Sequence, residues 1–165
     1  MKINLKHWLY ASLLIGLTAQ VYYFFMLPDV VANHFGNNGL ANGWMSNWAN
    51  LMVSSLTFTI NSMVFLSAPY IFKKTPIKFI SFPKKEYWLA PERKDKSIIS
   101  ISIWIYFFGL ATNVFFIVIF HLVFLANDKK PPGIDENIFF ILLITYFVIT
   151  GTWLIALFRK FNKTN

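Results

Sequence analysis

The stretch IISISIWIYFFGLATNVFFIVIFHLVFLA, residues 98–126, decides the fold, because it runs for 29 residues without Lys, Arg, Asp or Glu. A helix rises about 1.5 Å per residue, so this run can cross the ~30 Å hydrocarbon core of a bilayer. Residues 8–27, 50–72 and 137–158 form three further uncharged, apolar runs of similar reach. Lipid offers backbone groups no hydrogen-bond partner, which makes each run a helix. The sequence predicts an all-α membrane protein with four transmembrane helices in an antiparallel bundle.

Composition supports a single membrane domain over residues 1–165, since 56% of the residues are hydrophobic and only 13% are charged. A soluble domain would carry about twice that charged fraction. Cysteine is absent, which excludes disulfides, zinc thiolate sites and thiol nucleophiles. The net charge of +8 lies beside the apolar runs, so we assign it to anionic lipid headgroups and expect the bilayer, not nucleic acid, as partner.

The basic residues also predict the orientation in the membrane. Thirteen of the fifteen Lys and Arg residues lie in the N-terminal tail, the loop 73–97 and the C-terminal tail. The loops 28–49 and 127–136 hold the other two. Basic segments next to membrane spans stay on the cytoplasmic side. We therefore expect a multi-pass protein of the cell (inner) membrane, with both termini and the loop 73–97 cytoplasmic and the other two loops outside.

Each apolar run carries small or polar residues at helical spacing, and these stripes are expected to face neighbouring helices. The stripes are Ser12, Gly16, Ala19 and Tyr23 with Gln20 alongside; Asn50, Ser54, Thr57 and Asn61; Ser102, Tyr106, Gly109 and Asn113; and Thr145, Thr152 and Ala156. They suit either contacts between helices or the path of a small transporter or channel subunit. The runs lack the charged residues that usually couple ion movement, which favours the first alternative. Pro69 is expected to end the second helix.

The two longest loops hold the most distinctive residues. Residues 30–35 of the outer loop have strand character, and the turn signals Asn38-Gly39 and Asn42-Gly43 predict a short hairpin or hook. In the cytoplasmic loop, Tyr87 and Trp88 suit an anchor at the lipid interface, and Pro91 with Glu92 suits the first turn of the third span.

These two loops also carry a family resemblance. The pattern LPxxxxxHFxxxGxxxGW over residues 27–44 resembles the signature of a bacterial integral-membrane domain of unknown function. That domain also forms the N-terminal part of SdpI-type toxin-immunity and signalling proteins. The stretch YWLAPER, residues 87–93, is similar to one found before a later span in the same family. The resemblance implies a binding or regulatory role of the immunity or signalling type.

The leading hypothesis is therefore a membrane protein whose outer loop meets a peptide, an envelope component or a partner span, with the oligomeric state left open. The candidate outer-loop residues are Asn33, His34, Phe35, Gly39, Gly43 and Trp44, and the cytoplasmic motif residues are Tyr87, Trp88, Pro91, Glu92 and Arg93. An outer-face metal-dependent enzyme is a further alternative, in which His34 and His121 meet. No cofactor and no catalytic residue is expected, because a paired-carboxylate or Ser-His-Asp pattern is missing from the sequence.

Overall fold

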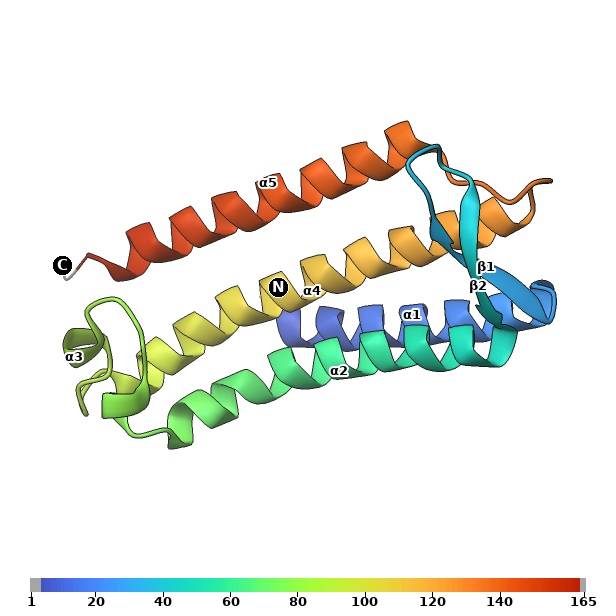
Figure 1. Ribbon diagram of the computed structural model, residues 1–165. Helices are drawn as coiled ribbons and strands as arrows, with labels where there is room; N and C mark the ends of the chain where they lie inside the picture. The colour runs from blue at the N-terminus through green and yellow to red at the C-terminus, as the bar shows by residue number, and fades with distance from the viewer. Residues whose placement is uncertain (1–3, 164–165) are drawn as a thin grey trace.

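Four long helices run back and forth along the molecule in the computed structural model, which describes residues 4–163 (Figure 1). They are α1 (Leu5–Met26), α2 (Asn47–Lys74), α4 (Lys94–Asn127) and α5 (Glu136–Phe161). Among the described residues, these four helices are long and apolar enough to cross a membrane, as predicted. Helix length and composition are therefore those of a multi-pass membrane protein.

Side-chain caps fix the starts of two helices, whereas a proline inside α2 does not end it. Ser46 caps α2 by accepting from Ala49 N at 3.2 Å, and Asp135 caps α5 by accepting from Ile138 N at 3.1 Å. The expectation that Pro69 ends the second helix is wrong, because α2 continues to Lys74. Proline removes one backbone donor and strains one turn, and packing in a long helix can override that cost.

The helices α1, α2 and α4 contact one another and form the core. Glycines allow the close approach: a Cβ on Gly16 would lie 2.6 Å from the ring of Phe58, and one on Gly109 would lie 2.7 Å from Phe65. Phe58 is fully buried in the space that Gly16 leaves. In lipid, where water does not drive helices together, such close contact between a small residue and a large one supplies much of the association energy.

A chain of polar side chains crosses this core. Asn113 of α4 donates from Nδ2 to Ser12 Oγ and Ser62 Oγ, both at 3.0 Å, and its Oδ1 accepts from Asn61 Nδ2 at 2.8 Å. Asn113 and Ser62 are fully buried. These bonds join α1, α2 and α4, so Ser12, Asn61 and Asn113 do face neighbouring helices as the stripes predict. We call Ser12, Asn61, Ser62 and Asn113 the polar seam.

Helix α5 packs mainly on α4, through aromatic residues. The ring of Trp153 stacks on Phe108 at 4.5 Å and its Nε1 donates to Trp104 O at 3.0 Å, while Tyr146 stacks on Phe115 at 4.3 Å. The predicted stripe on this helix is wrong, because Thr145 and Thr152 are exposed. The next residue along the chain, Tyr146 or Trp153, faces α4 in each case.

The loop 28–49 forms the predicted hairpin, an antiparallel pair of β1 (Val30–Phe35) and β2 (Ala41–Ser46). The Asn38-Gly39 turn is confirmed, and Gly39 has the positive φ of 70° that glycine adopts readily. The second predicted turn is wrong, because Asn42-Gly43 lies inside β2. The pairing skips Asn33 on one strand and Asn42 on the other, so the signal marks a pair of bulges.

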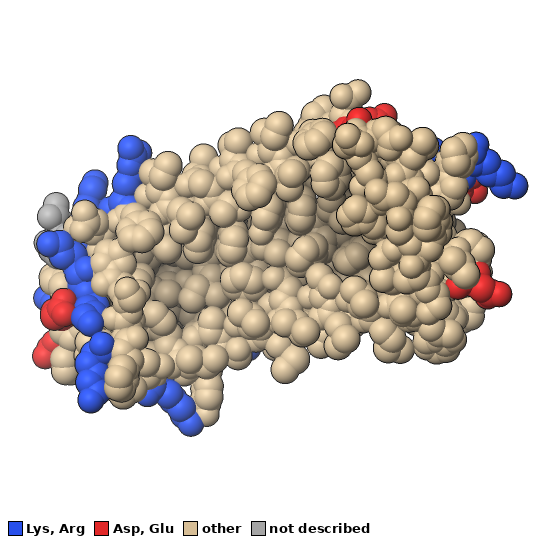
Figure 2. All heavy atoms as spheres, in the orientation of Figure 1, with Lys and Arg blue, Asp and Glu red and all other residues tan. Residues whose placement is uncertain are grey.

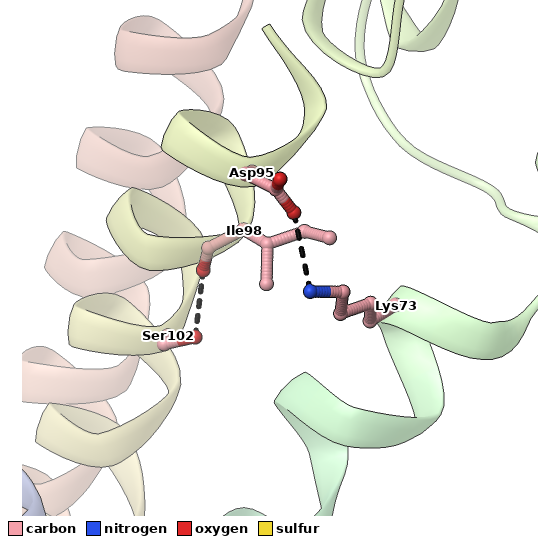
Figure 3. A network of polar contacts seen from close by, with 4 residues as sticks. All are labelled: Lys73, Asp95, Ile98 and Ser102. Atoms are coloured by element: carbon pink, nitrogen blue, oxygen red, sulfur yellow. Dashed lines mark hydrogen bonds and ion pairs between the residues drawn. The ribbon is translucent and has the colours of Figure 1, made fainter. Parts of the chain in front are cut away.

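The opposite end of the molecule holds the chain between α2 and α4, with the short elements η1 (Ile77–Phe79) and α3 (Lys85–Trp88). Lys and Arg side chains gather at this end (Figure 2). Lys73 and Asp95 form an exposed ion pair of 3.3 Å between α2 and α4 (Figure 3). The expectation that Pro91 and Glu92 begin the third span is wrong, since they form a turn and α4 begins at Lys94.

Candidate functional site

A cavity of about 520 Å³ lies at the hairpin end, where β1, α4 and α5 meet. Its lining consists of Asn33, His34, Phe35, Gly36, Asn37, Ile119, Val123, Ile134, Glu136, Phe139 and Phe140. Three of the six outer-loop residues singled out from the sequence therefore line one cavity, and we call it the hairpin cavity.

The hairpin cavity has one polar and one apolar side. The hairpin contributes amide and imidazole groups, and α5 contributes the carboxylate of Glu136 from its first turn. The helices contribute the apolar side, with Ile119 and Val123 on α4 and Phe139 and Phe140 on α5. A mostly apolar hollow with a few polar groups is typical of a site for a small or amphipathic ligand.

One asparagine fixes the hairpin to α4, and a second joins the start of α2 to the end of α1. The side-chain amide of Asn127, the last residue of α4, accepts from Ala32 N at 2.8 Å and donates to Ala32 O at 2.9 Å. It thereby pairs with β1 as a neighbouring strand would. Asn47, the first residue of α2, donates to Phe24 O at 2.8 Å and Leu27 O at 3.2 Å. These bonds satisfy carbonyls at the end of α1 that have no partner within the helix.

The tip of the hairpin is tied to the loop between α4 and α5. Ala41 N donates to Pro132 O at 3.1 Å, and Ile134 N donates to Gly39 O at 2.9 Å. A Cβ on Gly39 would lie 2.6 Å from Ile134 O and 3.1 Å from the side chain of Glu136. Only glycine satisfies both the positive φ and this close approach. Gly39 thus lets the hairpin tip approach the start of α5, where Ile134 and Glu136 line the cavity.

His34 is held in one orientation by its neighbour across the hairpin. Its Nδ1 is hydrogen-bonded to Asn42 Oδ1. An amide oxygen only accepts, so Nδ1 carries the hydrogen, and Nε2 of the neutral ring remains an acceptor. A Cβ on Gly43 would lie 2.9 Å from His34 Cβ, so this glycine makes room for the histidine. The pair of bulges therefore fixes the imidazole of His34 in an orientation in which Nε2 is the nitrogen that Asn42 does not use.

His121 lies on a different side of α4 from the cavity. Successive helical residues are about 100° apart, so residues 119 and 123, which line the cavity, face nearly opposite to residue 121. His121 Nδ1 instead hydrogen-bonds to Tyr23 Oη of α1 at 2.9 Å. The structure does not bring His34 and His121 together. No group of three or more His, Asp or Glu side chains able to hold a metal ion occurs within residues 4–163.

Trp44 and the motif of residues 87–93 have other environments. Trp44 is 56% exposed and does not line the cavity. At the other end, Trp88 Nε1 donates to Phe161 O at 2.7 Å, and the Arg93 guanidinium lies 4.2 Å from the centre of the Tyr87 ring. Phe161 is fully buried. The motif therefore ties the end of α5 to the chain that leads into α4.

Sequence reasoning missed the helical half of the cavity and the asparagine that fixes the hairpin. The expected bounds place Phe139 and Phe140 in the fourth span, 137–158, and Asn127 and Glu136 in the loop 127–136. An asparagine directly after a long apolar run was an available signal, because a buried amide needs hydrogen-bond partners. The phenylalanines gave no such signal, since half of α5 consists of similar apolar residues.

Comparisons with family models, with curated proteins and with solved structures gave no match for this chain.

Proposed function

We propose that this protein is a membrane-embedded binding protein that takes an amphipathic ligand into the hairpin cavity. The observation that carries the proposal is the convergence of His34 and Asn33 on the hairpin with Glu136 on α5 around one hollow. The apolar part of the ligand would lie against Phe139 and Phe140. A donor-bearing part, such as an ammonium or amide group, would meet the carboxylate of Glu136 and Nε2 of His34.

The family resemblance supports the same role. The pattern over residues 27–44 singles out His34, Gly39, Gly43 and Trp44. Gly39 and Gly43 provide the close approaches that shape the hairpin, and His34 lines the cavity. We propose on this basis that the chain acts as an immunity- or signalling-type protein of the SdpI-like kind, which senses or sequesters a peptide or envelope amphiphile.

In the orientation that we propose, the hairpin cavity lies at the outer face of the cell membrane and the basic end of the molecule lies at the cytoplasmic face. This orientation rests on the bias of Lys and Arg towards the end that holds η1, α3 and the last turn of α5. The chain contains no cysteine, so single-cysteine variants report without background. An impermeant maleimide added to intact cells should label Asn37→Cys and not Ser81→Cys. The reverse pattern would overturn the orientation.

Photo-crosslinking tests the binding proposal. A benzophenone amino acid would replace Phe140, which lines the cavity and is 54% exposed, or Phe147, which is 62% exposed on the same helix but outside the cavity. We expect a discrete adduct from position 140 in cells, absent from position 147, and weakened by Glu136→Gln or His34→Ala. Identical adducts from both positions, unaffected by either substitution, would contradict the proposal.

The geometry supports the transporter or channel alternative less well. That alternative needs water or substrate along the polar seam. The amide of Asn113 instead uses both Nδ2 hydrogens and its oxygen within the protein. A fully buried amide whose hydrogen bonds are all made between helices holds those helices together. It leaves no free donor or acceptor for a passing ion.

A further inference from the structure

A second hollow, of about 390 Å³, lies at the basic end, between α2 and the chain that follows it. After α2 ends at Lys74, the chain turns back, so that Ile80 is buried and the ring of Phe82 lies 5.8 Å from that of Phe72. The hollow is the groove between this returning segment and α2. It lies at the opposite end of the molecule from the hairpin cavity and shares no residue with it.

The walls of this groove suit a hydrocarbon chain. Val64, Ala68, Ile71 and Thr75 follow one another at steps of three and four residues, so they form one face of α2. That face spans roughly 16 Å at 1.5 Å per residue, which is close to the length of an extended fatty acyl chain. Phe79 lines the other side and is 71% exposed, so its ring offers apolar surface to a bound chain.

Two lysines are next in the chain to residues that line the groove. Lys74 lies one residue before Thr75, with its Nζ 4.5 Å from the centre of the Tyr70 ring. Lys78 lies on η1, with its Nζ 4.9 Å from the ring of Phe79. Within the described residues the single ion pair is the one between Lys73 and Asp95 (Figure 3), so no acidic side chain neutralises Lys74 or Lys78.

We propose that this groove binds one anionic phospholipid, with an acyl chain along α2 and the phosphate between Lys74 and Lys78. The positive charge at this end of the molecule favours an anionic lipid over a zwitterionic one. The loop 73–97 holds eight Lys and Arg residues against three acids, and basic residues near a membrane surface attract anionic lipid. A zwitterionic lipid would gain little from the lysines. The site does not depend on the function proposed for the hairpin cavity.

Native mass spectrometry of the purified protein in detergent tests this proposal, with phosphatidylglycerol and phosphatidylcholine of identical chains as probes. We expect retention of a single phosphatidylglycerol in preference to phosphatidylcholine. The double variant Lys74→Gln, Lys78→Gln should weaken that binding by about tenfold or more, by the attraction of two lysines. The control Lys84→Gln, Lys85→Gln removes the same charge from the same loop and should leave binding within about twofold.

A second pair of variants tests the groove separately from the charge. Ala68→Trp would fill the groove and should displace the bound phosphatidylglycerol, whereas Ile141→Trp on the exposed face of α5 should not. Equal loss in the two lysine pairs would overturn the proposal, because it would mean diffuse attraction to the loop. Equal binding of both lipids would overturn it as well. A dimer that Ala68→Trp abolishes, with no lipid retained, would assign the groove to a second copy of the chain instead.

Discussion

The two sides of α4 differ in how they hold their neighbours. The side towards α1 and α2 is closely packed and carries buried amides and hydroxyls that bond to one another, with Asn113 at the centre. The side towards α5 relies on stacked rings, and no residue of α5 is fully enclosed before Phe161. The closely packed polar contacts of α4 and its aromatic contacts therefore lie on different sides of the helix. The hairpin cavity lies on the side of the aromatic contacts, towards α5.

Asn113→Leu should have the largest effect on stability. The substitution keeps the branched shape and the number of side-chain heavy atoms but leaves Asn61 and Ser62 without their buried partner. We expect a loss of about 2–3 kcal/mol in the free energy of unfolding, measured by denaturant titration in detergent. The same substitution at exposed Asn137 is the control, with a change below about 0.5 kcal/mol. Equal stabilities for the two variants would remove the polar seam from the account.

Two glycines on the two sides should respond in opposite directions to alanine. A Cβ on Gly109 would lie 2.7 Å from Phe65, whereas one on Gly151 of α5 would have nothing within 4 Å. Gly109→Ala should lower the free energy of unfolding by about 1–2 kcal/mol through overpacking. Gly151→Ala should raise it by up to about 1 kcal/mol through helix propensity. Thermal unfolding in detergent measures both, and a shift of the same sign in both variants would refute the contrast.

Asn127→Ala should act locally and weaken the attachment of the hairpin. The side chain makes two hydrogen bonds to Ala32, which the variant loses. We expect faster hydrogen exchange of the β1 amides by about tenfold, with global stability reduced by no more than about 1 kcal/mol. Hydrogen exchange followed by mass spectrometry provides the measurement. Unchanged exchange in residues 30–35 would show that the hairpin is held by other contacts.

The sequence was sufficient to predict the features of the fold that arise because lipid forms no hydrogen bonds with the protein. Uncharged runs became helices because no other local structure satisfies the backbone there, and Ser12, Asn61 and Asn113 met because buried polar groups seek partners. The hairpin followed from its strand pattern and the Asn38-Gly39 turn.

Helix α5 shows where such reasoning stops. Thr152 donates to Val148 O at 2.8 Å on its own helix, so its hydroxyl needs no neighbour and does not orient the helix. Trp153, one residue on, has more surface to bury and faces α4 instead. The spacing of amide side chains is therefore a better predictor of the packed face of a helix than the spacing of hydroxyl side chains. An amide group is rarely satisfied within one helix. The apolar half of the hairpin cavity was hidden for another reason, because Phe139 and Phe140 lie in a helix made mostly of similar apolar residues.

Cysteine reactivity at one position on each side tests the central claim most directly, namely that the polar seam is dry while the hairpin cavity is open. Ser62→Cys would place a thiol in the seam, and Val123→Cys would place one in the cavity. Thiols react with a maleimide as thiolates, which require water. The account predicts that Val123→Cys is labelled in the folded protein and Ser62→Cys only after unfolding. Labelling of folded Ser62→Cys as fast as Val123→Cys would contradict it.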